Sequence, residues 1–204
     1  MISADPTSPQ RATDPRPART RAAIYAAIDR LGTLGSPVTV AAIVAEAQIS
    51  RSSFYSQFRD FDDVAVQVIT ALLADIQHID SQVRNSHGHR DATVSTFDLF
   101  FAKCRQQRGL YRAVLCGDLS HRARTEISRV MTQSALATAE LAAPPNVDRT
   151  LAATFISAGV LAVTTEWLSS DEPVSEEYLL TQIFGLLPWW VVGTTNGGAS
   201  AAGS

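Results

Sequence analysis

Cysteine is scarce in this sequence, with two among 204 residues, Cys104 and Cys116. Their separation matches no metal-binding or redox motif, so we expect two free thiols among apolar neighbours. The first 30 residues also lack a basic segment followed by an apolar run, the pattern of a secretory signal. Both absences favour a reducing cytoplasm as the location.

Net charge is small as well, at -3, which excludes a global attraction to nucleic acid. Residues 1–60 nevertheless hold seven arginines and five acidic residues, a balance of +2, so the rest of the chain has a balance of -5. Any affinity for nucleic acid must therefore come from a local surface in a mildly basic N-terminal part.

The sequence has no motif that would carry catalysis. It contains no glycine-rich phosphate loop and no Ser-His-Asp or Cys-His arrangement that we can place. His87 and His89 flank Gly88 in a segment that we interpret as a loop, with no thiols or carboxylates at metal-binding spacing. We interpret these two, with His78 and His121, as surface histidines. The prediction is a protein that is not an enzyme and uses no metal or cofactor; a small helical enzyme is the less favoured alternative.

Alternating strand patterns are missing too, whereas apolar residues recur at helical spacing along nearly the whole chain. We therefore predict an all-α fold with a head at residues 18–62 and a body at 63–192. Residues 1–17, with four prolines, and residues 193–204, rich in glycine and other small residues, are predicted to be a flexible arm and tail. The helices are expected at 18–34, after Thr39, after Ser50, from about 61, and at 91–107, 109–117, 120–142, 147–169 and 175–191.

Two short helices joined by a tight turn are predicted in the stretch TVAAIVAEAQISRSSFYSQF, with Thr39 and Ser50 as their N-caps. The apolar residues share an inner face: Ile43, Val44, Ile49, Phe54 and Phe58. The second helix then has hydrogen-bonding side chains outside: Arg51, Ser52, Ser53, Tyr55 and Gln57. Arginine can fork onto guanine, and hydroxyls can meet bases or phosphates, so the pattern indicates a DNA-binding helix-turn-helix. A solvated polar surface helix is the alternative.

The run TVAAIVAEAQISRSSFYSQFRDFDDV, preceded by RTRAAIYAAIDRLGTLG, resembles the N-terminal domain of the TetR family of transcriptional regulators. The resemblance covers about residues 19 to 66. It implies a three-helix helix-turn-helix head that binds double-stranded operator DNA, and a helical body that binds a small molecule and forms a homodimer. The DNA-contacting positions are then Thr39, Ser50, Arg51, Ser52, Ser53, Tyr55, Gln57, Arg19, Arg21 and Arg59.

The sequence departs from the family pattern at three positions. Gln48 replaces the glycine of the turn, where a left-handed conformation would cost on the order of 1 kcal/mol. Gln57 replaces a histidine and keeps a hydrogen-bond donor without charge. Phe61 stands where a lysine usually touches phosphate, so we expect a shallower salt dependence of DNA binding.

Two apolar segments of the body indicate a homodimer. The segment from Leu151 to Leu168 approaches the length of a membrane span, but its small polar residues and Glu166 favour a packed helix, and we predict no membrane contact. Together with residues 175–191 it offers more apolar surface than one body can cover. The predicted interface residues are Leu151, Ile156, Val160, Val163, Leu179, Ile183, Leu186, Leu187 and Trp190. Burial wholly inside one subunit is the alternative.

An aromatic cluster is the best candidate for an effector pocket. We predict that the pocket is lined by Phe97, Phe101, Cys104, Tyr111, Phe155, Glu166 and Trp167, although such stripes also form plain cores. Glu166 would pair with Arg112 or Arg122, or contact the ligand. The long fourth helix should present Leu72, Ile76 and Ile79 to this pocket. The resulting hypothesis is a repressor released by a small apolar or aromatic effector, with a ligand-independent architectural DNA binder as the alternative.

Overall fold

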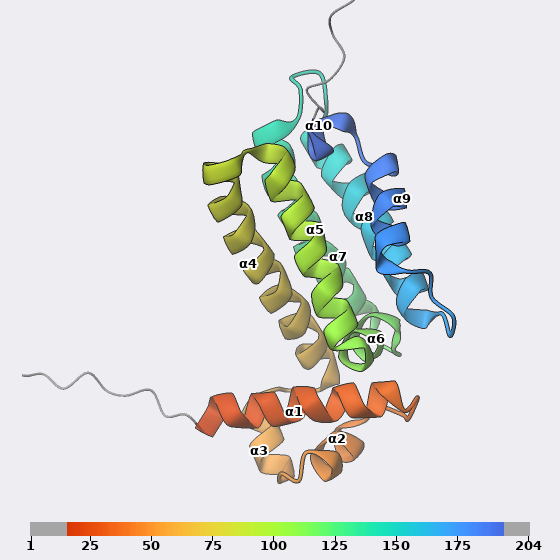
Figure 1. Ribbon diagram of the computed structural model, residues 1–204. Helices are drawn as coiled ribbons and strands as arrows, with labels where there is room; N and C mark the ends of the chain where they lie inside the picture. Colours follow the sequence, from red (N-terminus) through yellow and green to blue (C-terminus); the bar gives the residue numbers. More distant parts are fainter. Residues whose placement is uncertain (1–15, 194–204) are drawn as a thin grey trace, which may run out of the picture.

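The computed structural model describes residues 16–193, and this part of the chain folds into helices with no strand (Figure 1), which confirms the predicted all-α fold. The predicted arm and tail lie almost wholly outside these residues. The elements are α1 (Arg16–Thr33), α2 (Val40–Glu46), α3 (Arg51–Tyr55), α4 (Phe61–His87), α5 (His89–Gln106), α6 (Arg108–Cys116), α7 (His121–Ala142), α8 (Arg149–Ser169), α9 (Glu176–Leu186) and α10 (Trp189–Val192).

Helices α1, α2 and α3 form the head, in which α1 lies across the lower end of the body and the two short helices lie beneath it (Figure 1). Phe54 and Phe58 are buried and their rings lie 5.9 Å apart, which anchors the five-residue helix α3. Thr39 and Ser50 cap α2 and α3 as predicted, since their hydroxyl oxygens accept hydrogen bonds from backbone N–H groups in the first turn of each helix. These contacts confirm the predicted helix-turn-helix geometry.

The turn between α2 and α3 keeps the left-handed conformation in spite of the missing glycine. Gln48 has φ 54° and is the one non-glycine residue with positive φ in the described chain. The Ile49 N–H bonds the Val44 carbonyl and the Gln48 N–H bonds the Ala45 carbonyl, so the turn closes α2 with backbone groups alone. The side chain of Gln48 is exposed and supplies no compensating contact in the described residues.

We expect Gln48→Gly to raise the free energy of unfolding by about 0.5 to 1 kcal/mol, because glycine adopts this conformation without a steric cost. Urea denaturation measures the change. The matched control is Ala47→Gly at the neighbouring residue, which has φ -76°. That variant should lose about the same amount, since glycine gains nothing there and adds unfolded-state entropy. Equal effects of the two variants would contradict the assignment of strain to Gln48.

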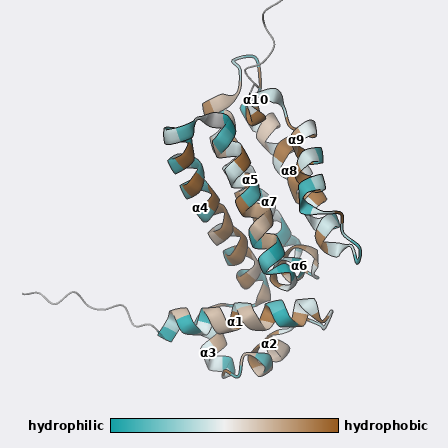
Figure 2. Ribbon diagram, viewed as in Figure 1, coloured by the Kyte–Doolittle hydropathy of each residue, from teal (hydrophilic) through white to brown (hydrophobic). Residues whose placement is uncertain are grey.

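The body is built on four long helices, α4, α5, α7 and α8, which run alongside one another above the head (Figure 1). Short α6 lies at the lower end of the body against α1, whereas α9 packs on α5, and α10 packs on α5 and α7. Brown segments run along the inward sides of the long helices in Figure 2, as expected for amphipathic helices packed around a core. One continuous apolar cluster joins head and body, and a second, smaller cluster lies around Ala139, Trp190 and Val191.

Two helix boundaries differ from the predicted ones. The expected loop around His87 is a single residue, Gly88, whose φ of 92° reverses the chain direction between α4 and α5. His87 and His89 are therefore helix termini and not loop residues. The helix predicted at 175–191 ends at Leu186, and the short helix α10 starts after Pro188, which lacks the N–H that a continuous helix needs.

Helix α6 is the main contact between head and body. Gly32 of α1 and Gly109 of α6 face each other so closely that a Cβ on Gly32 would lie 2.1 Å from the Gly109 carbonyl oxygen. Asp29 of α1 accepts a hydrogen bond of 2.9 Å from the Leu110 N–H, at the N-terminus of α6. Backbone therefore packs directly on backbone at this crossing.

Candidate DNA-binding surface and effector cavity

The outer face of α3 is open to solvent, as a base-reading helix requires. Arg51, Ser52 and Tyr55 are exposed, and Ser53 is half-buried. Within residues 16–193, no hydrogen bond or ion pair holds the Arg51 guanidinium. Tyr55 packs edge-on against Phe54, with ring centroids 5.5 Å apart, and more than half of this residue stays exposed. The guanidinium of Arg51 and the phenol of Tyr55 are thus carried by a short helix that is anchored to the core.

Three serines at the start of α3 form a hydroxyl cluster. The Ser50 hydroxyl lies 2.8 Å from that of Ser52 and 2.9 Å from that of Ser53, and its oxygen also accepts the Ser53 N–H. Ser50 is therefore occupied as the helix cap. Ser52 is exposed and does not cap the helix, so its hydroxyl remains for a contact with a phosphate or a base.

Arg21 of α1 connects the flank of α3 to the body. Its guanidinium donates to the Gln57 side-chain oxygen at 3.0 Å and to Gln67 of α4 at 3.4 Å, and lies 5.4 Å from the Phe58 ring centroid. Gln57 thus orients the Arg21 guanidinium beside the exposed face of α3. Arg19, two residues earlier on the same helix, is exposed, and no ion pair holds it in the described chain.

The remaining two predicted contacts lie on either side of this face. Arg59 is exposed and forms an ion pair with the mostly buried Asp63, with 3.5 Å between nitrogen and oxygen. Burial acts to raise the pKa of Asp63, but hydrogen bonds from the Arg59 backbone and from Gln67 hold that pKa below its ordinary value. Thr39 is exposed at the N-terminus of α2. Phe61 is half-buried against the core, so no cation replaces the family's lysine at that position.

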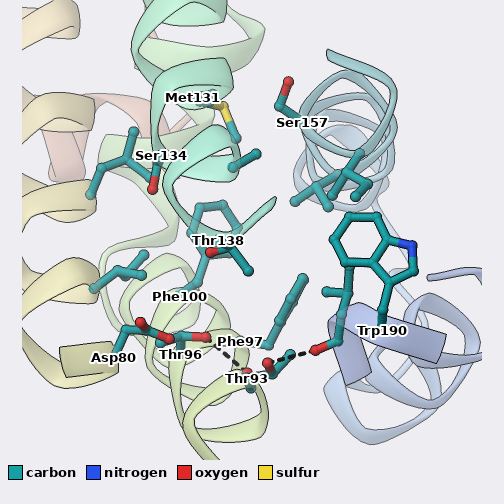
Figure 3. A pocket seen from close by; sticks show the side chains of 16 residues that line it. Asp80, Thr93, Thr96, Phe97, Phe100, Met131, Ser134, Thr138, Ser157 and Trp190 are labelled. Atoms are coloured by element: carbon teal, nitrogen blue, oxygen red, sulfur yellow. Dashed lines mark hydrogen bonds between the residues drawn. The ribbon is translucent and has the colours of Figure 1, made fainter. Parts of the chain in front are cut away.

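A cavity of about 120 Å³ lies inside the body, enclosed by five helices (Figure 3). Its wall is mostly apolar and aromatic, with Phe97 and Phe100 on one side and Trp190 on another. The lining residues are Leu73, Ile76 and Asp80 of α4, Thr93, Thr96, Phe97 and Phe100 of α5, Met131, Ser134, Ala135 and Thr138 of α7, Ile156, Ser157 and Val160 of α8, and Trp190 and Val191 of α10. An engineered apolar cavity of about 150 Å³ holds benzene, so this space alone is slightly smaller than one that holds a six-membered ring.

One end of the cavity leads to the surface. A second hollow of about 270 Å³ shares Ile76, Asp80, Thr96, Ser134 and Thr138 with it and continues past the exposed Leu141. The opposite end is closed by α10, which is held by a 2.8 Å hydrogen bond from the Thr93 hydroxyl to the Val191 carbonyl. The last helix therefore forms an end wall.

Of the seven predicted pocket residues, the structure places one, Phe97, on the wall of this cavity. Four others pack in the main core instead: Phe101, Cys104, Tyr111 and Trp167. They lie on α5, α6 and α8 and face neighbouring helices rather than the cavity, as the contact between Phe101 and Trp167 shows. Burial raises the pKa of the Cys104 thiol to about 12, which agrees with an unreactive core cysteine. Phe155 and Glu166 are exposed, and Asp171 rather than Glu166 lies near Arg112. Whether any of these residues contacts an effector stays a prediction.

The predicted interface residues also separate into groups. Leu179, Ile183 and Trp190 are buried within the subunit, so they are not available to a partner. Ile156 and Val160 line the cavity, and Val163 and Leu187 are half-buried against the cores. Leu151 and Leu186 remain exposed, at 69% and 76%, and Phe155 joins them at 72%. The structure therefore leaves an apolar outer face on α8 and α9 that includes the predicted Leu151 and Leu186 together with Phe155.

Among the described helices, α8 alone is long and apolar enough to cross a membrane, by length and composition. In its most apolar 18-residue stretch, 28% of the stretch is buried. Its buried side packs on α7, and Arg108 donates to the carbonyls of Trp167, Leu168 and Ser170 at its C-terminus. Core helices of soluble proteins have the same length and composition, so these properties are weak evidence for a span. The exposed side of α8 still requires a covering surface.

The polar residues of the cavity and the contact between α1 and α6 were not predicted from the sequence. Asp80, Thr96, Ser134 and Thr138 lie on three different helices, so no single helical pattern brings them together. The two glycines at the α1–α6 crossing, Gly32 and Gly109, are 77 positions apart in the chain. Glycines within predicted helices were the one available signal, because glycine is unfavourable there unless close packing needs it.

No protein-family model matches the sequence, and no curated protein does. Solved structures do match it. A protein described as a TetR-family transcriptional regulator from Syntrophomonas wolfei has a TM-score of 0.66 at 13% identity, over 92% of this chain and 100% of that one. A TetR transcriptional regulator from Streptococcus agalactiae has a TM-score of 0.52 at 18% identity, over 85% of this chain and 96% of that one.

A third similar structure is the transcriptional regulator FadR from Bacillus subtilis in complex with stearoyl-CoA. Its TM-score is 0.61 at 14% identity, over 83% of this chain and 96% of that one. In all three cases the likeness runs through head and body alike, as the shares covered require. The chain therefore has the fold of the TetR-family transcriptional regulators, in agreement with the family that its helix-turn-helix residues resemble.

Proposed function

We propose that this protein is a dimeric, ligand-responsive transcriptional regulator that binds operator DNA through α3. The observation that carries the proposal is the outer face of α3, where Arg51 and Tyr55 are exposed on a helix anchored by buried Phe54. A helix of this kind fits the major groove, and its N-terminal residues contact base edges. The similar solved structures of transcriptional regulators support the same function.

The exposed apolar face of α8 and α9 supports a homodimer. Leu151 and Phe155 lie one helical turn apart on α8, and Leu186 is exposed on α9. A Cβ added to Gly159 of α8 or to Gly185 of α9 would meet no atom within 4 Å, so a partner helix can approach closely. A second copy with the same surface would cover this face around a two-fold axis. Two heads related by that axis require a near-palindromic operator with half-sites about 34 to 36 Å apart.

The cavity supports control by a small molecule. It lies between α4, which begins at the head, and the helices of the body. The similar FadR structure holds stearoyl-CoA, so a body of this fold accommodates a ligand in that protein. A ligand that favours a different position of α4 would change the spacing of the two heads and release the DNA, as in a repressor. A hundredfold loss of DNA affinity requires about 2.7 kcal/mol of coupling.

Selection of bound fragments from the source genome, followed by fluorescence anisotropy, tests the proposal. A near-palindromic fragment bound by a dimer supports it, and the absence of any sequence-selective binding refutes it. A ligand that binds the protein equally well with and without operator would favour a ligand-independent architectural DNA binder, because coupling between two sites is reciprocal.

We expect Arg51→Ala to weaken binding to the selected fragment by about 1 to 3 kcal/mol, because it removes a bidentate contact to a base. The anisotropy titration is repeated over a range of salt concentrations. Arg149→Ala is the charge-matched control. Arg149 is exposed at the start of α8, which belongs to the body and not to the head. An equal loss in both variants would mean that Arg51 contributes only net charge.

A further inference from the structure

The cavity has a polar end and an apolar end, and this division indicates which molecules fit it; the inference rests on the proposed role of the cavity as an effector site. The end toward α10 is formed by Phe97, Trp190 and Val191, and the Thr93 hydroxyl at this end is occupied, because it donates to the Val191 carbonyl at 2.8 Å. The end toward the surface holds Asp80 of α4, Thr96 of α5, and Ser134 and Thr138 of α7, which also line the outer hollow. Figure 3 shows Asp80 and Thr96 side by side at this end.

Asp80 is the only charged residue among the described residues that line the cavity, and it is already neutralised. Arg84, one turn further along α4, donates from Nε to one Asp80 oxygen at 3.0 Å and from Nη2 to the other at 2.6 Å. Both side chains are mostly buried, with 21% and 18% exposed. A bidentate pair of this kind is strong, and opening it inside a low-dielectric wall is costly. The polar end therefore offers no uncompensated charge.

The hydroxyl groups of the cavity differ in whether their hydrogen bonds are already formed within the protein. Thr96 donates its proton to the Thr93 carbonyl at 2.8 Å, and Ser157 donates to the Thr154 carbonyl at 3.2 Å or to Thr132. Ser134 and Thr138, four residues apart on one face of α7, have no hydrogen-bond partner in residues 16–193. These two hydroxyls can each donate and accept one bond, as a ligand hydroxyl can.

We propose that the cavity binds an uncharged molecule with an aromatic or compact apolar body and a hydroxyl head, with the body between Phe97 and Trp190 and the head at Ser134 and Thr138. A carboxylate head would face Asp80 while Arg84 is already engaged, so repulsion and desolvation both oppose it. An ammonium head would lose its hydration to meet a carboxylate whose charge Arg84 already balances. A ligand hydroxyl that leaves water replaces its hydrogen bonds to water by hydrogen bonds to Ser134 and Thr138, so its transfer into the cavity costs little free energy.

Three probes that share one body separate these cases: 3-phenylpropan-1-ol, 3-phenylpropanoate and 3-phenylpropylammonium. Their affinities for the full-length protein are measured by calorimetry at pH 7 without DNA. We expect the alcohol to bind at least tenfold more tightly than either ion. Equal affinities, tighter binding of an ion, or no saturable binding of the alcohol would each overturn the proposal.

Variants test the position of the head. Replacing Ser134 by Ala together with Thr138 by Val should weaken binding of the alcohol at least fivefold and leave the weak binding of the ions unchanged. Asp80→Asn removes the negative charge but keeps Arg84, so the affinity for 3-phenylpropanoate should rise at least tenfold. The control is Thr125→Val, at an exposed position of α7 outside the cavity, which should bind all three probes like the parent protein. A Thr125 variant that loses the alcohol equally would refute the assigned head position.

A separate titration with the selected DNA fragment distinguishes this inference from the proposed function. Binding of the alcohol without any change in DNA affinity would support the assigned ligand class and refute ligand control of DNA binding. Release of DNA by 3-phenylpropanoate alone would support ligand control and refute the assigned class.

Discussion

Phe155→Glu should leave the protein monomeric at micromolar concentration, with a mass of 21.9 kDa in sedimentation, and should weaken operator binding at least a hundredfold. Phe155 is 72% exposed on the outer face of α8, one turn from the exposed Leu151. In a dimer built on this face the ring is covered, and a carboxylate there would be buried without a partner on both subunits. A single head then binds a half-site alone and loses the advantage of two linked contacts.

The matched control for this variant is Gln133→Glu, which places the same carboxylate at an exposed position of α7. It should remain dimeric and bind the operator with nearly the affinity of the parent. The cavity does not include Phe155, so the Phe155 variant should still bind 3-phenylpropan-1-ol. A Phe155→Glu protein that stays dimeric would place the interface elsewhere on the body.

The head was predictable from sequence because its determinants are local. The caps Thr39 and Ser50, the inward pair Phe54 and Phe58, and the polar residues between them lie within 20 positions, and each acts through its own helix. The left-handed conformation of Gln48 did not follow from its own residue type, because glutamine has no preference for it; the resemblance to a family with glycine at this position was the only indication. Local patterns also gave the number and approximate length of the long helices.

The cavity was not predictable, because a helical stripe shows which face is apolar and not what that face meets. Phe97 and Phe101 are one turn apart on α5, yet the first lines the cavity and the second is packed against Trp167. The difference comes from neighbouring helices that are distant in sequence. The interface prediction had the same limit, since α8 is apolar on several sides and only packing on α7 decides which side stays exposed.

The contact between α1 and α6 shows how far the head depends on the body. A Cβ on Gly109 would lie 1.9 Å from the Asp29 carbonyl oxygen and 2.6 Å from the Thr33 backbone nitrogen. Both are backbone atoms of α1 and cannot move aside as a side chain can. The methyl group can be accommodated only if α1 and α6 separate, which also weakens the hydrogen bond from the Leu110 N–H to Asp29.

We therefore expect Gly109→Ala to lower the free energy of unfolding by about 3 kcal/mol, at the upper end of the cost of overpacking. Urea denaturation measures this loss. The control is Ser128→Ala, at an exposed position within α7 and outside the proposed interface. There the higher helix propensity of alanine should raise the stability of the subunit by less than about 1 kcal/mol. A Gly109 variant that matches this control would show that the crossing is looser than the structure has it.

Gly32→Ala inserts a methyl group at the same crossing from the other side, 2.1 Å from the Gly109 carbonyl oxygen. Once either substitution has separated α1 from α6, the second methyl group has room, so it lowers the free energy of unfolding by little more. The losses of the two single variants should therefore not add, and the double variant should lose at least about 1 kcal/mol less than their sum. Additive losses would mean that each glycine acts on its own helix. A large non-additive term would show that the two glycines act together at one crossing, so that a single separation of α1 from α6 accounts for both losses.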